Sequence, residues 1–186
     1  MSSYTFRKDA FNKAYTYKIE EDGLAWSSVN GSGKIEFKKL AKTRLIYSPN
    51  RYQKNTYVLE LIDKYGGKTI IRNTNYESLG NFKEQNEAFN TFVAELHKIL
   101  VVANPDMIFS SGTTPTLYFV YWIIMVFSVF VILGVFYFII TIGVIWIAIA
   151  HLLFVLYLFP TFIKFLKKNK PGIYNPNQIP QSMLPA

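Results

Sequence analysis

The sequence predicts an α+β soluble domain followed by a two-helix transmembrane hairpin, and two observations predict it. All 12 acidic and 16 of the 20 basic residues lie in residues 1–106, whereas 107–163 contains no Asp, Glu, Lys or Arg. The charged part also shows short stretches of alternating apolar and polar residues, followed by one segment with an apolar stripe. The chain is therefore divided into a domain over 1–105, a linker over 106–114, a helical hairpin over 115–166 and a tail over 167–186.

Short strands are expected over most of residues 14–72. Apolar side chains alternate with polar ones, as in Tyr15, Tyr17 and Ile19, and Gly-rich turn segments separate the stretches. Six strands are expected, over 14–19, 24–28, 34–40, 43–48, 57–62 and 68–72. This number of short strands favours an antiparallel β sandwich or barrel.

One C-terminal amphipathic helix is expected to cap the sheet. Asn81 and Glu84 have the spacing of a capping box, so the helix is expected to begin there and to end at Asn104-Pro105. One face carries an apolar stripe of Phe89, Phe92, Val93, Leu96 and Leu100. His97 borders this stripe, and we expect it to be a half-buried packing residue.

The uncharged run from Thr116 to Ile163 is 48 residues long. A bilayer core needs about 20 helical residues, so the run predicts two crossings. Thr114 followed by Pro115 is typical of a helix start, and we expect helices near 115–137 and 141–166.

The orientation of the hairpin is predicted from lysines that follow the second helix, whereas the turn carries none. These are Lys164, Lys167, Lys168 and Lys170. Basic residues that flank transmembrane segments favour the cytoplasmic side, so both termini are expected to be cytoplasmic.

His151 is the one ionisable side chain within the apolar run, where such residues are functional candidates. In a hairpin that is symmetric about the middle of the run, His151 faces Ser128, and we expect a hydrogen bond between them. A proton relay, a cofactor ligand and a contact with another subunit are the alternatives for His151.

Strands followed by one C-terminal amphipathic helix are the order of a pleckstrin-homology-like fold. Further motifs are Tyr47-Ser-Pro-Asn-Arg51, Asn75-Tyr76 with Phe82, Phe92-Val93 with Leu96-His97, Ala103-Asn-Pro105, Tyr174-Asn-Pro-Asn-Gln-Ile-Pro180 and Leu184-Pro185. With these motifs the chain resembles an uncharacterised family of small bacterial inner-membrane proteins over nearly its whole length. The resemblance implies a pleckstrin-homology-like domain with a C-terminal membrane anchor, and it implies no activity.

Catalytic and cofactor chemistry is not indicated. Cysteine is absent, and His97 and His151 are too far apart for a zinc site. Neither Asn30-Gly-Ser-Gly33 nor Gly66-Gly67 leads into a helix as a phosphate-binding loop does. We therefore expect no enzyme activity, no cofactor and, because basic and acidic residues are interleaved, no nucleic acid.

Two groups of residues are candidates for binding. Basic side chains that can contact anionic lipid headgroups are Lys38, Lys39, Lys42, Arg44, Arg51 and Lys54. The proline-punctuated tail favours an extended conformation that docks into a groove of a partner or of the domain itself, through Tyr174, Pro176, Ile179, Pro180 and Leu184.

The expected function is that of a non-enzymatic, membrane-anchored interaction module, as an accessory or assembly subunit of a complex in the bacterial inner membrane. Its expected partners are membrane lipids and other membrane protein subunits, since its many phenylalanines suit packing against further helices. The alternatives are a peripheral sensor of anionic lipid headgroups and a cofactor-carrying or catalytic membrane protein that uses His151.

Overall fold

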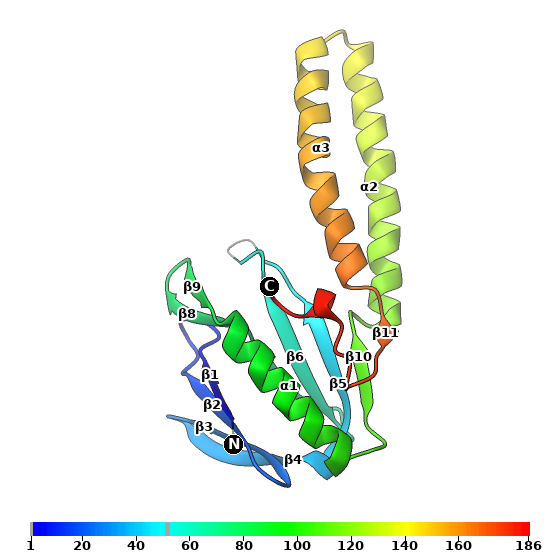
Figure 1. The fold of residues 1–186 in the computed structure, drawn as a ribbon. Helices are drawn as coiled ribbons and strands as arrows, with labels where there is room; N and C mark the ends of the chain where they lie inside the picture. Colours follow the sequence, from blue (N-terminus) through cyan, green and yellow to red (C-terminus); the bar gives the residue numbers. More distant parts are fainter. Residues whose placement is uncertain (1, 51–52) are drawn as a thin grey trace. The chain divides into compact units, whose positions relative to one another are not determined.

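The computed structural model describes residues 2–50 and 53–186. The chain forms two compact units (Figure 1). The first, here called the sheet unit, contains the residues up to Gly112 together with Gly172–Ala186. The second, the hairpin unit, is Thr113–Pro171. The hairpin unit is therefore an insertion between two segments of the sheet unit.

The sheet unit contains a four-stranded antiparallel sheet made by consecutive strands. Its strands are β1 (Ser3–Phe6), β2 (Tyr15–Ile19), β3 (Gly23–Ser28) and β4 (Gly31–Glu36). A short 3-10 helix, η1 (Phe37–Lys39), leads from it into the next sheet.

A five-stranded sheet has the order β11-β10-β5-β6-β7. Its strands are β5 (Leu40–Tyr47), β6 (Tyr57–Asp63), β7 (Lys68–Arg72), β10 (Ile108–Ser111) and β11 (Gly172–Ile173). The pairs are antiparallel except that β10 runs parallel to β5. A third sheet is the hairpin of β8 (Thr74–Ser78) and β9 (Asn81–Glu84). The predicted α+β class is confirmed, but none of these three sheets closes into a barrel.

Helix α1 extends over Asn86–Ala103, so the prediction that a capping box starts the helix at Asn81 is wrong. Asn81 starts β9 instead, and Gly80 makes the preceding turn with φ of 77°. Tyr76 and Phe82 pair across the two strands with their ring centroids 5.3 Å apart. This tertiary pairing holds residues 81–84 extended, and α1 can start only after them.

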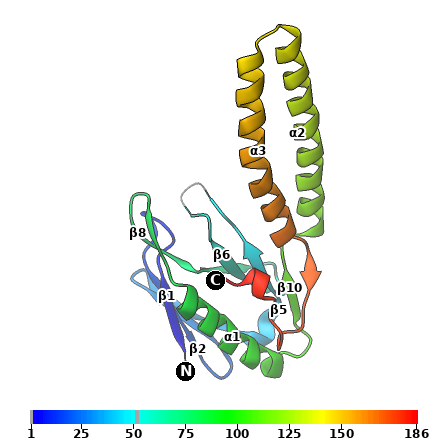
Figure 2. The same cartoon turned by 45° about the horizontal axis from the view of Figure 1, so that its top comes forward.

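The core of the sheet unit is centred on α1, which runs between the two larger sheets in both views (Figures 1 and 2). All five residues of its predicted apolar stripe are fully buried. The Tyr4 ring of β1 lies 5.9 Å from the Phe89 ring and 5.5 Å from the Phe92 ring. The stripe thus packs on the sheet through aromatic contacts.

The segment predicted as a linker, 106–114, contains β10 of the five-stranded sheet. Within it β10 pairs with β5, and the Ser110 hydroxyl donates to the Thr43 carbonyl at 2.9 Å. Asn104 anchors the chain just before it by donating to the carbonyls of Phe37 and Leu40. Most of the predicted linker therefore belongs to the sheet unit, which extends to Gly112.

The hairpin unit consists of α2 (Pro115–Thr141) and α3 (Ile145–Lys168). Each helix is long and apolar enough to cross a membrane, since α2 alone spans about 40 Å and a bilayer core about 30 Å. The Thr114 hydroxyl caps α2 by accepting from the Leu117 amide, where a start is predicted. Thr141, predicted to begin the second helix, instead donates to the Tyr137 carbonyl within α2, and the turn falls at Gly143 with φ of 75°.

Candidate functional site

Arg44 is not available for lipid headgroups, which corrects the prediction for this residue. The register of β5 and β6 places it opposite Glu60, and its Nε and Nη2 lie 3.0 and 2.5 Å from Glu60 Oε2. The two side chains are only 8% and 13% exposed. Arg44 therefore forms a buried ion pair whose charge is compensated within the sheet.

The other basic candidates do not form one surface. Lys39 pairs with Glu36 at 2.6 Å on the surface, Lys38 is exposed, and Lys42 is half-buried. Lys54 is exposed in the loop that follows the C-terminal end of β5. Lys38 and Lys39 precede the other end of this eight-residue strand, and its two ends are roughly 23 Å apart. Arg51 lies outside the described residues.

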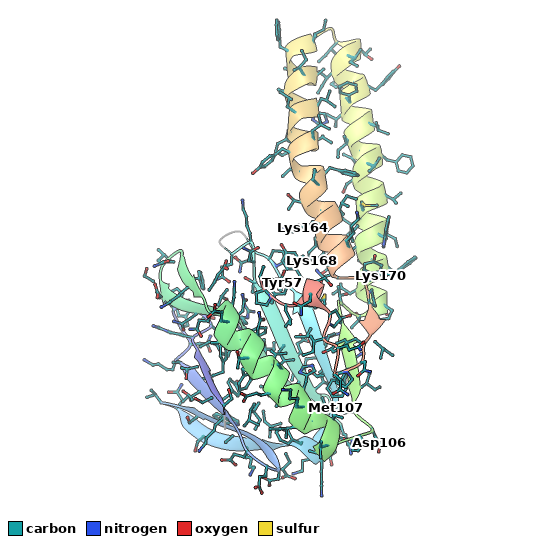
Figure 3. The ribbon with its side chains drawn as sticks, in the orientation of Figure 1. Tyr57, Asp106, Met107, Lys164, Lys168 and Lys170 are labelled. Atoms are coloured by element: carbon teal, nitrogen blue, oxygen red, sulfur yellow. The ribbon has the colours of Figure 1, made fainter. Side chains whose placement is uncertain are left out.

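The four lysines after the apolar run lie together at one end of the hairpin unit. Figure 3 labels Lys164 and Lys168 on the last turns of α3 and Lys170 just beyond it. Lys167 and Lys168 stand in the last turn, where positive charge interacts favourably with the helix dipole. The end of α3 is thus suited to the polar surface of a membrane.

A groove of about 270 Å³ lies between α2 and α3 and is lined almost entirely by apolar side chains. We call it the hairpin groove, and its lining includes Met125, Val129, Val155 and Phe162. His151 also lines it, and its Nε2 is buried without a hydrogen-bond partner among the described residues. The groove therefore contains one unsatisfied polar atom in an apolar setting.

The predicted hydrogen bond between Ser128 and His151 is not formed. Ser128 lines the same groove, but its hydroxyl donates to the Ile124 carbonyl one turn earlier at 2.7 Å. With the turn at Gly143, Val135 is the residue level with His151, and Ser128 lies about 10 Å further along α2. The symmetric hairpin assumed from the sequence placed the turn too early.

Tyr174 in the tail packs against His97 of α1, a residue 77 positions earlier. Its hydroxyl lies 2.7 Å from His97 Nε2, and His97 Nδ1 lies 2.7 Å from the Val93 carbonyl. A carbonyl only accepts, so Nδ1 carries the ring proton and Nε2 accepts from the tyrosine. His97 is fully buried, not half-buried as predicted, and burial lowers its pKa to about 4, although the Val93 hydrogen bond opposes the shift.

The rest of the tail folds onto the sheet unit. Asn90 donates to the Pro185 carbonyl at 2.9 Å and Asn86 to the Ala186 carbonyl at 2.7 Å. The tail residues Met183 and Pro185 are buried, and a 3-10 helix, η2 (Gln181–Met183), lies beside β5. The other tail candidates, Pro176, Ile179, Pro180 and Leu184, are half-buried.

Sequence reasoning did not anticipate the contributions of Asn86, Asn90 and Phe109 to this surface. Asn86 and Asn90 lie on α1 and Phe109 lies on β10, and the tail residues that they contact are some 65 to 100 positions away, so no local pattern identifies them. No group of three His, Asp or Glu residues that could hold a metal ion occurs in the described part of the chain.

No protein-family model matches the chain, and neither the curated proteins nor the solved structures compared with it give a match.

Proposed function

We propose that the chain is a non-enzymatic, membrane-anchored interaction module that serves as an accessory or assembly subunit of an inner-membrane protein complex. The observation that carries this proposal is the buried, unpaired Nε2 of His151 in the hairpin groove. Lipid chains cannot hydrogen-bond, so an unsatisfied polar group in the membrane is costly. A transmembrane helix of another subunit that brings a hydroxyl or carboxamide to this nitrogen would fill the groove and satisfy it.

The proposal includes a pleckstrin-homology-like sheet unit on the cytoplasmic side of a bacterial inner membrane. The order of strands followed by α1 supports the fold, and the sequence motifs such as Tyr47-Ser-Pro-Asn-Arg51 support the bacterial family. The lysines at the end of α3 support the orientation. Headgroup sensing is less well supported, because Arg44 is paired and the remaining basic residues are dispersed.

The proposal is tested by photo-crosslinking in the native membrane. A benzophenone amino acid replaces Phe154, which lines the hairpin groove, or Phe130, which does not. Both rings are well exposed, and each lies about 15 Å from the turn along its helix. We expect Phe154 to give an adduct with one membrane subunit, identified by mass spectrometry, and Phe130 to give none.

The role of His151 is tested in the same experiment. His151→Leu removes the polar atom, so the adduct is expected to fall at least ten-fold, and the identified subunit is expected to co-purify only with the unsubstituted chain. Equal protein adducts from both positions, or adducts with lipid alone, would contradict the proposal. A visible absorbance of the purified chain that disappears in His151→Ala would instead support a cofactor carrier.

A further inference from the structure

The tail Gly172–Ala186 packs on a surface of the sheet unit that is formed by α1, β10 and β5. We call this contact surface the tail groove, and define it by Asn86, Asn90 and His97 on α1, Phe109 on β10, and the part of β5 beside η2. In Figures 1 and 2 the tail, drawn in orange to red, runs from β11 beside β10 and β5 to the C-terminus. The contacts that hold it show what the groove recognises.

At one end the groove recognises an extended backbone. Ser110 and Ser111 of β10 pair with Ile173 and Gly172, and the Tyr174 amide donates to the Phe109 carbonyl at 3.1 Å. Such pairing at a sheet edge uses main-chain groups only, so it admits any extended segment.

The tyrosine that follows provides selectivity. Its ring lies near the rings of His97, at 5.9 Å, and Phe109, at 6.3 Å, and the residue is 9% exposed. Because His97 Nδ1 is held by Val93, Nε2 is left as an acceptor that only a hydroxyl or amide donor satisfies. A phenylalanine fits the same space but leaves that acceptor unpaired.

At the other end Asn86 and Asn90 donate to backbone carbonyls, and an apolar side chain, Met183, is buried. Between the two ends, the side chains of Asn175, Asn177, Gln178, Gln181 and Ser182 are exposed. The hydrogen bonds made by residues 175–182 stay within the tail, and no ion pair involves the tail among the described residues. The tail is therefore held by hydrogen bonds to the sheet unit at its two ends, whereas between them only the apolar residues Pro176, Ile179 and Pro180 are half-buried.

We propose that the tail groove is a peptide-recognition site, occupied here by the chain's own tail, and that this tail is exchanged there for a segment of a partner subunit that pairs with β10 at its start and turns as the tail does. The segment that fits carries a tyrosine, an apolar residue nine positions later and a proline two positions after that, as Tyr174, Met183 and Pro185 do. This proposal rests on the proposed function of an interaction module and names a second surface through which it acts.

The test measures displacement of the tail in the full chain in detergent micelles. The chain has no cysteine, so Thr91→Cys and Ser182→Cys, both at exposed positions, place two spin labels without background. Double electron–electron resonance then gives the distance between α1 and the tail while a synthetic peptide of residues 172–186 is added. We expect the distance to become longer and broader as the peptide binds, and a peptide with Tyr174→Phe to need at least ten-fold higher concentration.

A second label pair, Thr91→Cys with Ser78→Cys, reports on unfolding, because neither exposed position lies in the tail. Its distance is expected to stay constant. A tail distance that does not change up to the solubility limit of the peptide would overturn the proposal, as would equal potency of the Tyr174→Phe peptide. A distance between chains labelled singly at Thr91 and at Ser182 would identify a second copy as the occupant, which also overturns it.

Failure here is distinguishable from failure of the proposed function. Crosslinking from Phe154 depends on the hairpin groove, and Phe154 lies on α3 within the hairpin unit. A persistent Phe154 adduct without tail exchange would overturn the recognition site alone.

Discussion

His97 shows how one buried side chain makes stability depend on pH. It is neutral in the folded chain, where burial lowers its pKa to about 4, whereas an unfolded histidine has a pKa of about 6.5. Tyr174, which faces it, stays protonated because burial raises the tyrosine pKa above its usual value. At a pH between these two pKa values, His97 binds more protons in the unfolded state than in the folded state. The free energy of unfolding therefore falls as the pH is lowered from about 6.5 to about 4.

The predicted decrease in the free energy of unfolding due to His97 is on the order of 3 kcal/mol once the pH is below both pKa values. Hydrogen exchange of the α1 amides in the full chain at pH 7 and pH 4.5 measures the free energy of opening. His97→Gln retains a donor and an acceptor but does not titrate in this range, so its opening energy is expected to vary less with pH. An equal pH dependence in both proteins would assign the effect to other groups.

The Arg44–Glu60 pair predicts an asymmetry between single and double substitutions. Arg44→Met leaves the carboxylate of Glu60 buried without compensation, which costs roughly 3–5 kcal/mol. The double variant Arg44→Met/Glu60→Leu removes both charges and is expected to recover most of that loss. Hydrogen exchange of β5 and β6 amides measures both, and a double variant as unstable as the single one would contradict this account.

Among the helices and strands, those whose position is determined by a local pattern of apolar residues were predicted from the sequence. The alternation in Tyr15, Tyr17 and Ile19 and the stripe of α1 identified strands and a helix because burial of one face imposes the period. Five strands were missed, because they are two to five residues long and depend on pairing with a partner strand; they are β1, β8, β9, β10 and β11. β10 pairs with a strand some 65 residues earlier, so nothing within 106–114 distinguishes it from a linker.

The candidate site was predicted less well for the same reason. The lysines at the end of α3 and His151 could be identified from the composition of the apolar run and its flank. The pairing of Arg44 with Glu60 depends on the register of β5 and β6. The contact of His97 with Tyr174 depends on how the whole chain folds, because the two residues are 77 positions apart. Ser128 was misplaced because an error of a few residues in the turn shifts the opposite helix by two turns.

The apolar stripe of α1 gives a prediction for this element. Phe92 is fully buried against Tyr4, so Phe92→Ala is expected to destabilise the sheet unit by about 3–5 kcal/mol through lost burial and a cavity. Thr91→Ala changes the neighbouring exposed position and is expected to alter stability by less than about 0.5 kcal/mol. Amide exchange in α1 compares the two, and equal effects would show that this stripe does not carry the core.

For the whole molecule, the insertion of the hairpin into a sheet constrains its topology. Ser111 and Gly172, on either side of the insertion, are paired in one sheet, and within the hairpin unit the Thr113 amide donates to the Asn169 carbonyl at 3.1 Å. The chain therefore leaves and re-enters the sheet unit at adjacent points. Because both ends of the insertion lie at one place in the sheet unit, the chain between them must cross a membrane an even number of times. Helices α2 and α3 are two segments long enough to do so.

This arrangement predicts that Ser3 and Ser182 lie on one side of the membrane and Ile142, in the turn, on the other. Single cysteines at these exposed positions have no background in a cysteine-free chain. With the orientation proposed from the lysines, a membrane-impermeant thiol reagent labels Ile142→Cys in cells with a permeabilised outer envelope, and Ser3→Cys and Ser182→Cys only in inverted vesicles. The reverse pattern would keep the hairpin and invert its orientation, whereas labelling of Ser3 and Ser182 from opposite sides would rule out the hairpin, because only an odd number of crossings separates them.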